Sequence, residues 1–153
     1  MFLGEYEHSL DAKQRLAVPA EVREIWNEER HGAGLVAAPG PNGSLWLWPE
    51  RTFGQIAEKF DTGLLAAEGL VQFERHVFSK AARVPFDSAG RIRIPDRLLK
   101  QFGLKSQVVV LGVRDHLEVM DLESWRQEEA AAPPSTDIWR QARAAHAAER
   151  RNG

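Results

Sequence analysis

The fold of this chain is decided by residues 87–95, whose sequence is Asp-Ser-Ala-Gly-Arg-Ile-Arg-Ile-Pro. Asp at the first position and Gly at the fourth are typical of a type I turn. Beyond the turn, isoleucine alternates with arginine. Because side chains of a strand alternate between its faces, this pattern predicts a short strand with one apolar and one basic face. Pro95 ends that strand and favours the first turn of a helix.

The same plan occurs 76 residues earlier, at residues 11–19, whose sequence is Asp-Ala-Lys-Gln-Arg-Leu-Ala-Val-Pro. Asp, Arg and Pro recur at matching positions. After each proline the apolar residues take helical spacing, at 22, 25 and 26 in the first copy and at 98, 99 and 102 in the second. One hairpin-to-helix unit has therefore been used twice.

Further strands complete each copy. Alternating or continuous apolar residues predict strands at residues 5–10, 35–38, 45–48, 84–86, 108–113 and 117–120, with turns at 39–43 and 114–116. Each half then has the order strand, turn, strand, helix, strand, turn, strand. Neither half can bury a core alone, so we expect the two to interleave into one barrel.

These elements divide the chain into a first repeat, a helical linker, a second repeat, and a C-terminal helix with a flexible tail, at residues 5–51, 52–80, 81–124 and 125–153. Apolar residues at helical spacing, continuing as far as Leu64, Leu65 and Leu70, predict the linker helices. Alanine and proline at 130–135 indicate a flexible break. The helix after it has a thin apolar face, and we expect it to be partly frayed.

The strand at 45–48 is apolar on both faces, because Trp46 and Trp48 alternate with two leucines. We expect it to be covered by the linker helix or by another subunit. A stacking platform for single-stranded nucleic acid is the less favoured alternative, since no arginines are interleaved there.

Composition sets the broad class. The 153 residues are 43% apolar and 27% charged, which suits a single domain with a packed core, and the formal net charge is −2. That charge argues against a generally basic nucleic-acid binder but leaves room for a local basic face. The sequence has no cysteine, no signal-peptide pattern and no apolar run near the roughly 20 residues that span a bilayer. We therefore expect a soluble cytoplasmic protein without membrane contact.

Catalytic and metal-binding motifs are missing from the sequence. The five histidines have no metal-ligand spacing, and the chain contains neither a nucleophile elbow nor a phosphate-binding loop. We expect no cofactor, no metal, no small-molecule substrate and no enzymatic activity.

A basic cluster lies in the second repeat. Residues 79–105 contain seven Lys and Arg side chains against two Asp, and the first turn adds Lys13 and Arg15. A two-stranded ribbon with arginines on its outer face fits the major groove of double-stranded DNA. The alternative is a solvated charged face on which Asp87 and Arg91 only brace their own turn.

Residues 1–20 and 86–95 together resemble the two conserved segments of the MraZ family of bacterial transcriptional regulators. The resemblance runs from Met1 to about Trp125, and beyond Gln127 we find none. It implies an α+β fold, mainly β with short helices, in which two AbrB-like half-barrels form one pseudo-twofold barrel. It also implies homo-oligomeric rings, binding to repeated DNA boxes, repression of the division and cell-wall gene cluster, and association with the nucleoid.

The family's Asp-x-x-x-Arg positions fall on Asp11 and Arg15 in the first repeat and on Asp87 and Arg91 in the second. Strand facing and charge add Lys13 and Arg93 as DNA-binding candidates. Whether Arg91 contacts DNA or braces the barrel is left open. The alternative functions are an AbrB-like antitoxin, a protein-binding adaptor barrel and, third, an enzyme on a related barrel.

One position departs from the family pattern. Gln14 stands where the first turn of the family usually has glycine. If the turn needs a left-handed backbone there, a residue other than glycine costs roughly 1–2 kcal/mol.

Overall fold

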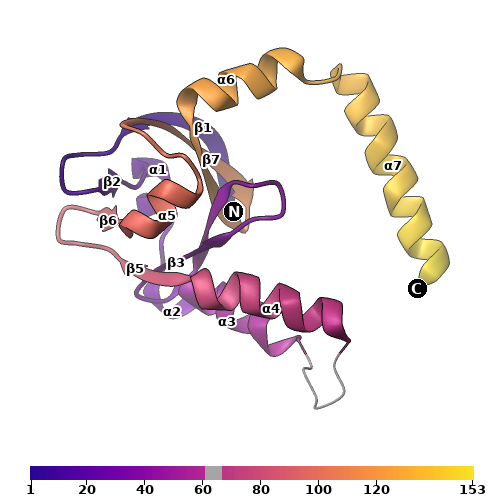
Figure 1. Ribbon diagram of the computed structural model, residues 1–153, viewed down its shortest axis with the longest axis horizontal. Coiled ribbons are helices and arrows are strands. Elements are labelled where there is room, and N and C mark those ends of the chain that lie inside the picture. Colours follow the sequence, from indigo (N-terminus) through magenta and orange to yellow (C-terminus); the bar gives the residue numbers. More distant parts are fainter. Residues whose placement is uncertain (61–66) are drawn as a thin grey trace. The chain divides into compact units, whose positions relative to one another are not determined.

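Antiparallel strands form the body of the protein (Figure 1). In the computed structural model, which describes residues 1–60 and 67–153, the strands are β1 (Phe2–Ser9), β2 (Arg15–Ala17), β3 (Gly34–Pro39), β4 (Leu45–Pro49), β5 (Ala82–Pro85), β6 (Arg91–Arg93), β7 (Gln107–Arg114) and β8 (His116–Asp121). The helices are α1 (Ala20–Glu24), α2 (Glu28–His31), α3 (Glu50–Glu58), α4 (Glu68–Lys80), α5 (Asp96–Gln101), α6 (Leu122–Ala131) and α7 (Ser135–Asn152). The chain divides into two units, Met1–Glu123 and Ser124–Gly153.

The two repeats interleave. One sheet has the strand order β1-β7-β8-β4-β3-β5, and β2 pairs with β6 in a separate two-stranded sheet. The strands on either side of each repeated turn pair with other strands and not with each other, so the expected hairpins are wrong. Exchanging each strand of the first repeat for its counterpart in the second leaves both orders unchanged, so the pairing has a pseudo-twofold symmetry. The predicted α+β class, with antiparallel sheets and a C-terminal helix, is confirmed.

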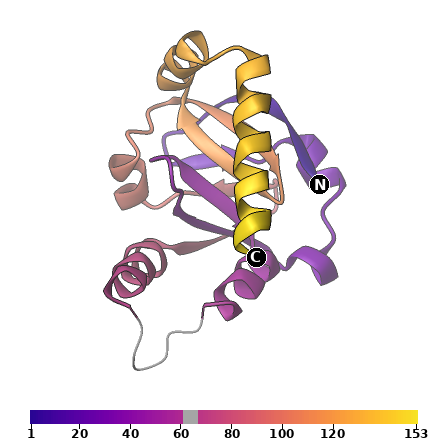
Figure 2. The same cartoon turned by 90° about the vertical axis from the view of Figure 1, so that its right-hand side faces the viewer.

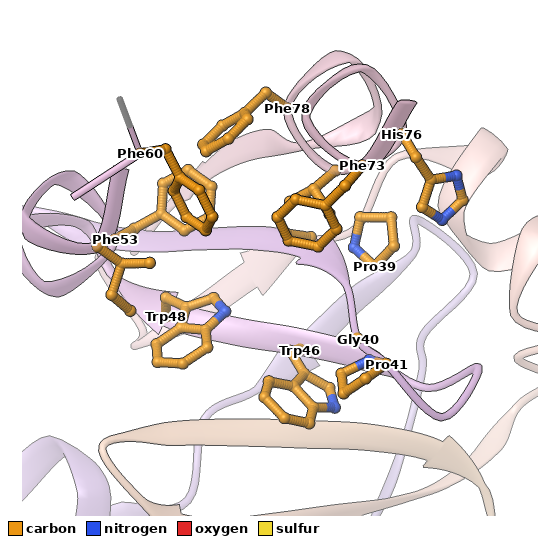
Figure 3. Close-up of a pocket in the computed structure, with 13 residues that line it drawn as sticks. Pro39, Gly40, Pro41, Trp46, Trp48, Phe53, Phe60, Phe73, His76 and Phe78 are labelled. Carbon is orange, nitrogen blue, oxygen red and sulfur yellow. The ribbon is translucent and has the colours of Figure 1, made fainter. Parts of the chain in front are cut away.

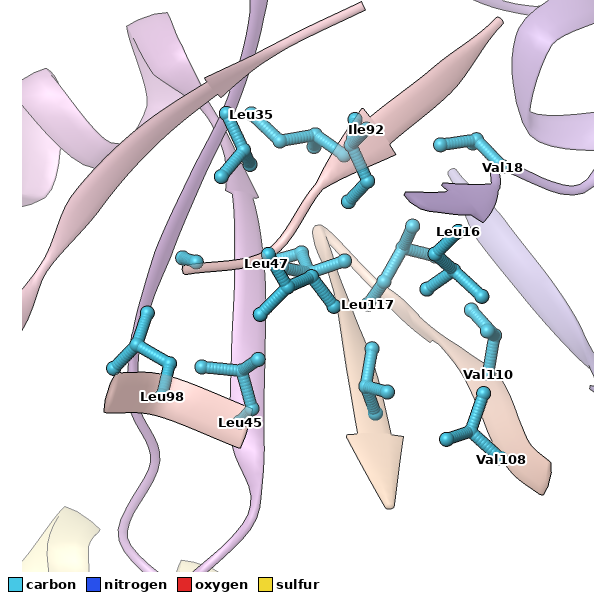
Figure 4. Packing of buried hydrophobic residues seen from close by; sticks show 14 of the residues in the cluster. Leu16, Val18, Leu35, Leu45, Leu47, Ile92, Leu98, Val108, Val110 and Leu117 are labelled. Carbon is cyan, nitrogen blue, oxygen red and sulfur yellow. The ribbon is translucent and has the colours of Figure 1, made fainter. Parts of the chain in front are cut away.

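The core lies between these sheets (Figure 4). Leu16 and Ile92 face each other across the β2–β6 ladder, and neither side chain is exposed to solvent. Leu47 and Leu117 from the central strands of the large sheet are buried in the same cluster. The apolar face predicted for each repeated strand is therefore the face that enters the core.

The first strand begins earlier than predicted, at Phe2 rather than at residue 5. Phe2 is buried and its ring stacks on Trp26, with ring centroids 6.3 Å apart. Gly4 interrupts the alternating pattern and hides this start. It has a φ of +102°, and a Cβ there would lie 2.6 Å from the Tyr6 hydroxyl oxygen.

The linker helices α3 and α4 cover the β3–β4 hairpin (Figure 1, Figure 2). The strand that carries Trp46 and Trp48 was expected to be covered by the linker helix or by another subunit, and the first of these is confirmed. A cavity of about 490 Å³ lies between them, and Trp46 and Trp48 form its floor opposite phenylalanines of the linker (Figure 3). The part of the predicted linker at residues 61–66, including Leu64 and Leu65, lies outside the described residues.

The C-terminal segment is more helical than predicted. The break is confined to residues 132–134, and α7 is continuous from Ser135 to Asn152. Alanine and arginine have high helix propensity, and an ion pair of 3.2 Å joins Arg140 to Asp137 one turn earlier. No helix in the described part of the chain is both long and apolar enough to cross a membrane.

Replacing Leu16 by alanine should lower the free energy of unfolding by about 2–5 kcal/mol, because it opens a cavity where the two repeats meet. Urea denaturation measures this change. Leu3→Ala is the matched control, since Leu3 is 63% exposed and its loss should cost less than about 0.5 kcal/mol. Equal effects of the two substitutions would contradict the position given to the β2–β6 ladder.

Candidate nucleic-acid interface

The first Asp-x-x-x-Arg turn is closed by one carboxylate. Asp11 Oδ1 accepts hydrogen bonds from the backbone N–H of Lys13 at 2.9 Å and of Arg15 at 2.8 Å. Arg15 Nε donates to Asp11 Oδ2 at 2.6 Å. The carboxylate therefore fixes both the backbone of the turn and the direction of the arginine side chain.

The second turn repeats this arrangement. Asp87 Oδ1 accepts from the N–H of Ala89 and of Arg91, both at 2.9 Å, and Arg91 Nε donates to Asp87 Oδ2 at 2.9 Å. In each turn the guanidinium uses Nε for the carboxylate, so the hydrogen bond leaves its two terminal nitrogens for other acceptors.

Hydrogen bonding also lowers the pKa of these carboxylates. The backbone N–H of Arg15 is the main cause that lowers the pKa of Asp11 below its usual value, and the N–H of Arg91 does the same for Asp87. Partial desolvation opposes the shift in both cases but is the weaker effect. Both aspartates are therefore ionised at neutral pH.

The backbone of the turns explains the departure at Gln14. Gln14 N–H donates to Asp11 O at 3.0 Å with a φ of +64°, and Gly90 N–H donates to Asp87 O at 3.0 Å with a φ of +74°. The left-handed geometry expected at Gln14 is therefore present. Its side-chain amide donates to Asp96 Oδ1 at the start of α5, and this bond offsets part of the backbone strain.

The β2–β6 ribbon brings the arginines together. Its register places Arg15 opposite Arg93 and Ala17 opposite Arg91. Since Leu16 and Ile92 between them are buried, these four residues share the outer face of the ribbon. Like charges directly opposite each other destabilise a strand pair, so the arrangement suits a surface that binds an anion.

The six predicted site residues lie on this ribbon and its turns. Asp11 and Lys13 are at one end and Asp87 at the other, because the strands are antiparallel and each turn precedes its own strand. The arginine-bearing ribbon is hereafter the set of Arg15, Arg91 and Arg93.

Two other cations of the predicted basic cluster make contacts within the fold. Arg97 Nη1 donates to Lys80 O at 2.6 Å, and so binds the C-terminal end of α4. Arg83 Nε pairs with Glu50 Oε1 at 3.0 Å. These residues position the linker, so the cluster is smaller than its composition suggests.

Sequence reasoning missed a buried polar group at the end of the β7–β8 hairpin. His116 was expected in a turn, but it belongs to β8 and is only 5% exposed. Its ring nitrogens lie 3.0 Å from carboxylate oxygens of Asp115 and Glu118, and its ring stacks on Trp46 at 3.9 Å. The pairing of distant strands β4 and β8 creates this contact, so no local pattern signals it.

Metal binding has no geometric basis in the described residues. Within them, no three His, Cys, Asp or Glu side chains are grouped so that they could hold a metal ion.

A duplicated turn whose aspartate orients an arginine, on a ribbon shared by both copies, defines a two-repeat β protein with a cationic surface. The family model described as "MraZ protein, putative antitoxin-like" matches residues 1–68 and 77–145. The chain therefore belongs to the MraZ family. The match reaches residue 145, so the expectation that the resemblance ends near Gln127 is wrong.

Several relatives carry the name "Transcriptional regulator MraZ". The protein from Lactiplantibacillus plantarum is 33% identical over 137 residues, which cover 90% of this chain and 94% of its own. The protein from Heliobacterium modesticaldum is 33% identical over 135 residues, covering 88% and 91%. The protein from Thermomicrobium roseum is 35% identical over 125 residues, covering 82% and 84%. The family is one of transcriptional regulators and not of enzymes.

Substitutions of Gln14 should separate backbone strain from the side-chain bond. Gln14→Ala keeps the left-handed residue and loses the bond to Asp96, whereas Gln14→Gly loses the bond and relieves the strain. We expect the glycine variant to be the more stable of the two by about 1 kcal/mol in urea denaturation. Equal stability of the two variants would show that the turn carries no strain at this position.

Acid should weaken the turns. A carboxyl whose pKa is lower in the folded state stabilises that state above its unfolded pKa and stops doing so as the pH falls through the folded value. The stability difference between wild type and the Asp11→Asn, Asp87→Asn double variant should therefore be full at neutral pH and disappear below the ordinary value of 3.8. Thermal unfolding from pH 7 to pH 2 measures it, and a difference independent of pH would refute the assignment.

Proposed function

We propose that this protein is a sequence-specific DNA-binding transcriptional regulator whose arginine-bearing ribbon enters the major groove. The observation that carries the proposal is the cross-strand pair of Arg15 and Arg93, with Arg91 beside it, on the outer face of a two-stranded sheet. A two-stranded ribbon has the width that the major groove admits. The names of the relatives support the same conclusion.

Arg15 and Arg91 are proposed to recognise bases. Each is held through Nε by its aspartate, so its terminal nitrogens approach the groove in a preset direction. A guanidinium fork matches guanine O6 and N7, and one such bidentate contact discriminates by about 1–3 kcal/mol. Because Arg91 is bound by Asp87 in the same way as Arg15 is bound by Asp11, we assign a DNA-binding role to both arginines. Lys13 and Arg93 would bind backbone phosphates.

Assembly of several copies would reconcile specific binding with a net charge of −2. We propose that the sheets close into a pseudo-twofold barrel of two AbrB-like halves, residues 5–51 and 81–124, and that such barrels form a homo-oligomeric ring. The exposed apolar residues Leu70 and Phe73 of the linker, residues 52–80, support self-association. A ring binding repeated boxes gains avidity, because linked sites act at an effective concentration on the order of mM.

The regulatory target follows from the family resemblance. The proposed ring would repress the division and cell-wall gene cluster, including its own gene, as a cytoplasmic, nucleoid-associated protein. The C-terminal segment, residues 125–153, has no role in this proposal.

A second candidate is an antitoxin or adaptor whose turns bind protein. The description "putative antitoxin-like" of the matching family model supports this second candidate. A toxin gene next to this one would favour it, and so would hairpin variants that leave DNA binding unchanged.

Two substitutions of one residue test the DNA-binding role. Arg15→Ala should abolish the preference for DNA from upstream of the protein's own gene over scrambled DNA. Arg15→Lys keeps the charge but not the fork, so it should bind both DNAs while losing about 5- to 150-fold of discrimination. Fluorescence anisotropy measures both affinities, and unchanged thermal unfolding shows that the fold is intact. Wild-type discrimination by the alanine variant would refute the role of Arg15.

A further inference from the structure

The two turns share their backbone but differ in the side chains placed against them. Positions 76 residues apart are equivalent in the two repeats, so Gln14 corresponds to Gly90 and Arg23 of α1 corresponds to Leu99 of α5. At the first turn, Gln14 and Leu99 line the same shallow hollow, and the Gln14 amide bonds the carboxylate of Asp96. The amide of Gln14 and the carboxylate of Asp96 therefore lie beside the first turn, and Lys105 lines the same hollow.

The second turn has an arginine in the corresponding place. The side chain of Arg23 lies directly over Gly90. A Cβ at residue 90 would be 2.5 Å from Arg23 Cδ, 2.8 Å from Nη1 and 3.0 Å from Nε. Glycine at this position therefore does more than permit the φ of +74°, because it leaves the space that the arginine occupies.

Backbone hydrogen bonds hold Arg23 in that space. Arg23 Nε donates to Val18 O at 3.1 Å, while Val18 N–H donates to Gly90 O at 3.2 Å. Val18 of the first repeat therefore binds both Gly90 in the second turn and the side chain of Arg23. Arg23 is exposed, and in the described part of the chain no carboxylate forms an ion pair with it.

We propose that Arg23 binds a DNA backbone phosphate beside the second turn, in addition to the contacts of the arginine-bearing ribbon. This inference rests on the proposed DNA-binding function. Arg23 lies on α1, beyond the end of the ribbon, where a protein seated in the major groove meets the phosphates that border it. The first turn carries Lys13 where the second has Ala89, so Arg23 places beside the second turn a cation that the other end of the ribbon has in Lys13.

A salt series on one pair of variants tests the contact. Arg23→Gln removes the charge but keeps an amide that can donate to Val18 O, and Arg30→Gln removes the same charge from α2, an exposed position outside the ribbon. For Arg23→Gln, we expect the slope of log K against log salt to become shallower by about 0.9, the value for one phosphate contact. Affinity should fall alike for native and scrambled DNA, and Arg30→Gln should keep the wild-type slope.

The possible results distinguish failure of the Arg23 phosphate contact from failure of the proposed DNA-binding function. A role in bracing alone would lower the melting temperature of Arg23→Gln and leave its salt slope equal to that of Arg30→Gln, which would overturn the phosphate contact while DNA binding stands. If the wild-type protein binds neither DNA, the proposed function and this inference both fail.

Discussion

The pairing of β2 with β6 is the constraint on which the rest of the structure depends. This ladder joins the two repeats at their repeated strands and buries Leu16 against Ile92. The same register places Arg15 opposite Arg93 on the other face. A slip of one residue would turn the arginines into the core and the isoleucine into solvent. The hydrophobic core therefore determines which cations meet on the surface.

The turns add direction to that charge. Each aspartate binds two backbone N–H groups and one guanidinium nitrogen, so the arginine is ordered before any partner arrives. Ordering in advance reduces the entropy lost on binding. Arg15 lies opposite Arg93, and its ion pair with Asp11 balances part of its charge in the free ribbon. In the proposed function an anion between the two arginines would reduce the repulsion that remains.

Much of the fold could be predicted because its signals are local and occur twice. The alternation after Asp87 and Asp11 predicted both strands of the ribbon but not their pairing with each other, and the departure from the family pattern identified Gln14. Contacts between distant segments gave no such signal. The bond from Gln14 to Asp96 and the ring of His116 on Trp46 join residues brought together only by strand pairing. The contact of Arg23 with Gly90 also had no local signal, because the sequence of α1 shows only an ordinary helical pattern.

The central claim, that the ribbon is a DNA-binding surface, is tested most directly by the wild-type protein itself. Fluorescence anisotropy would compare DNA from upstream of its own gene with scrambled DNA across a salt series. The account predicts a clear preference for the native DNA and a linear fall of log K with log salt, at about −0.9 per phosphate contact. Equal and weak binding to both DNAs would contradict it and leave the ribbon as a charged surface for a protein partner.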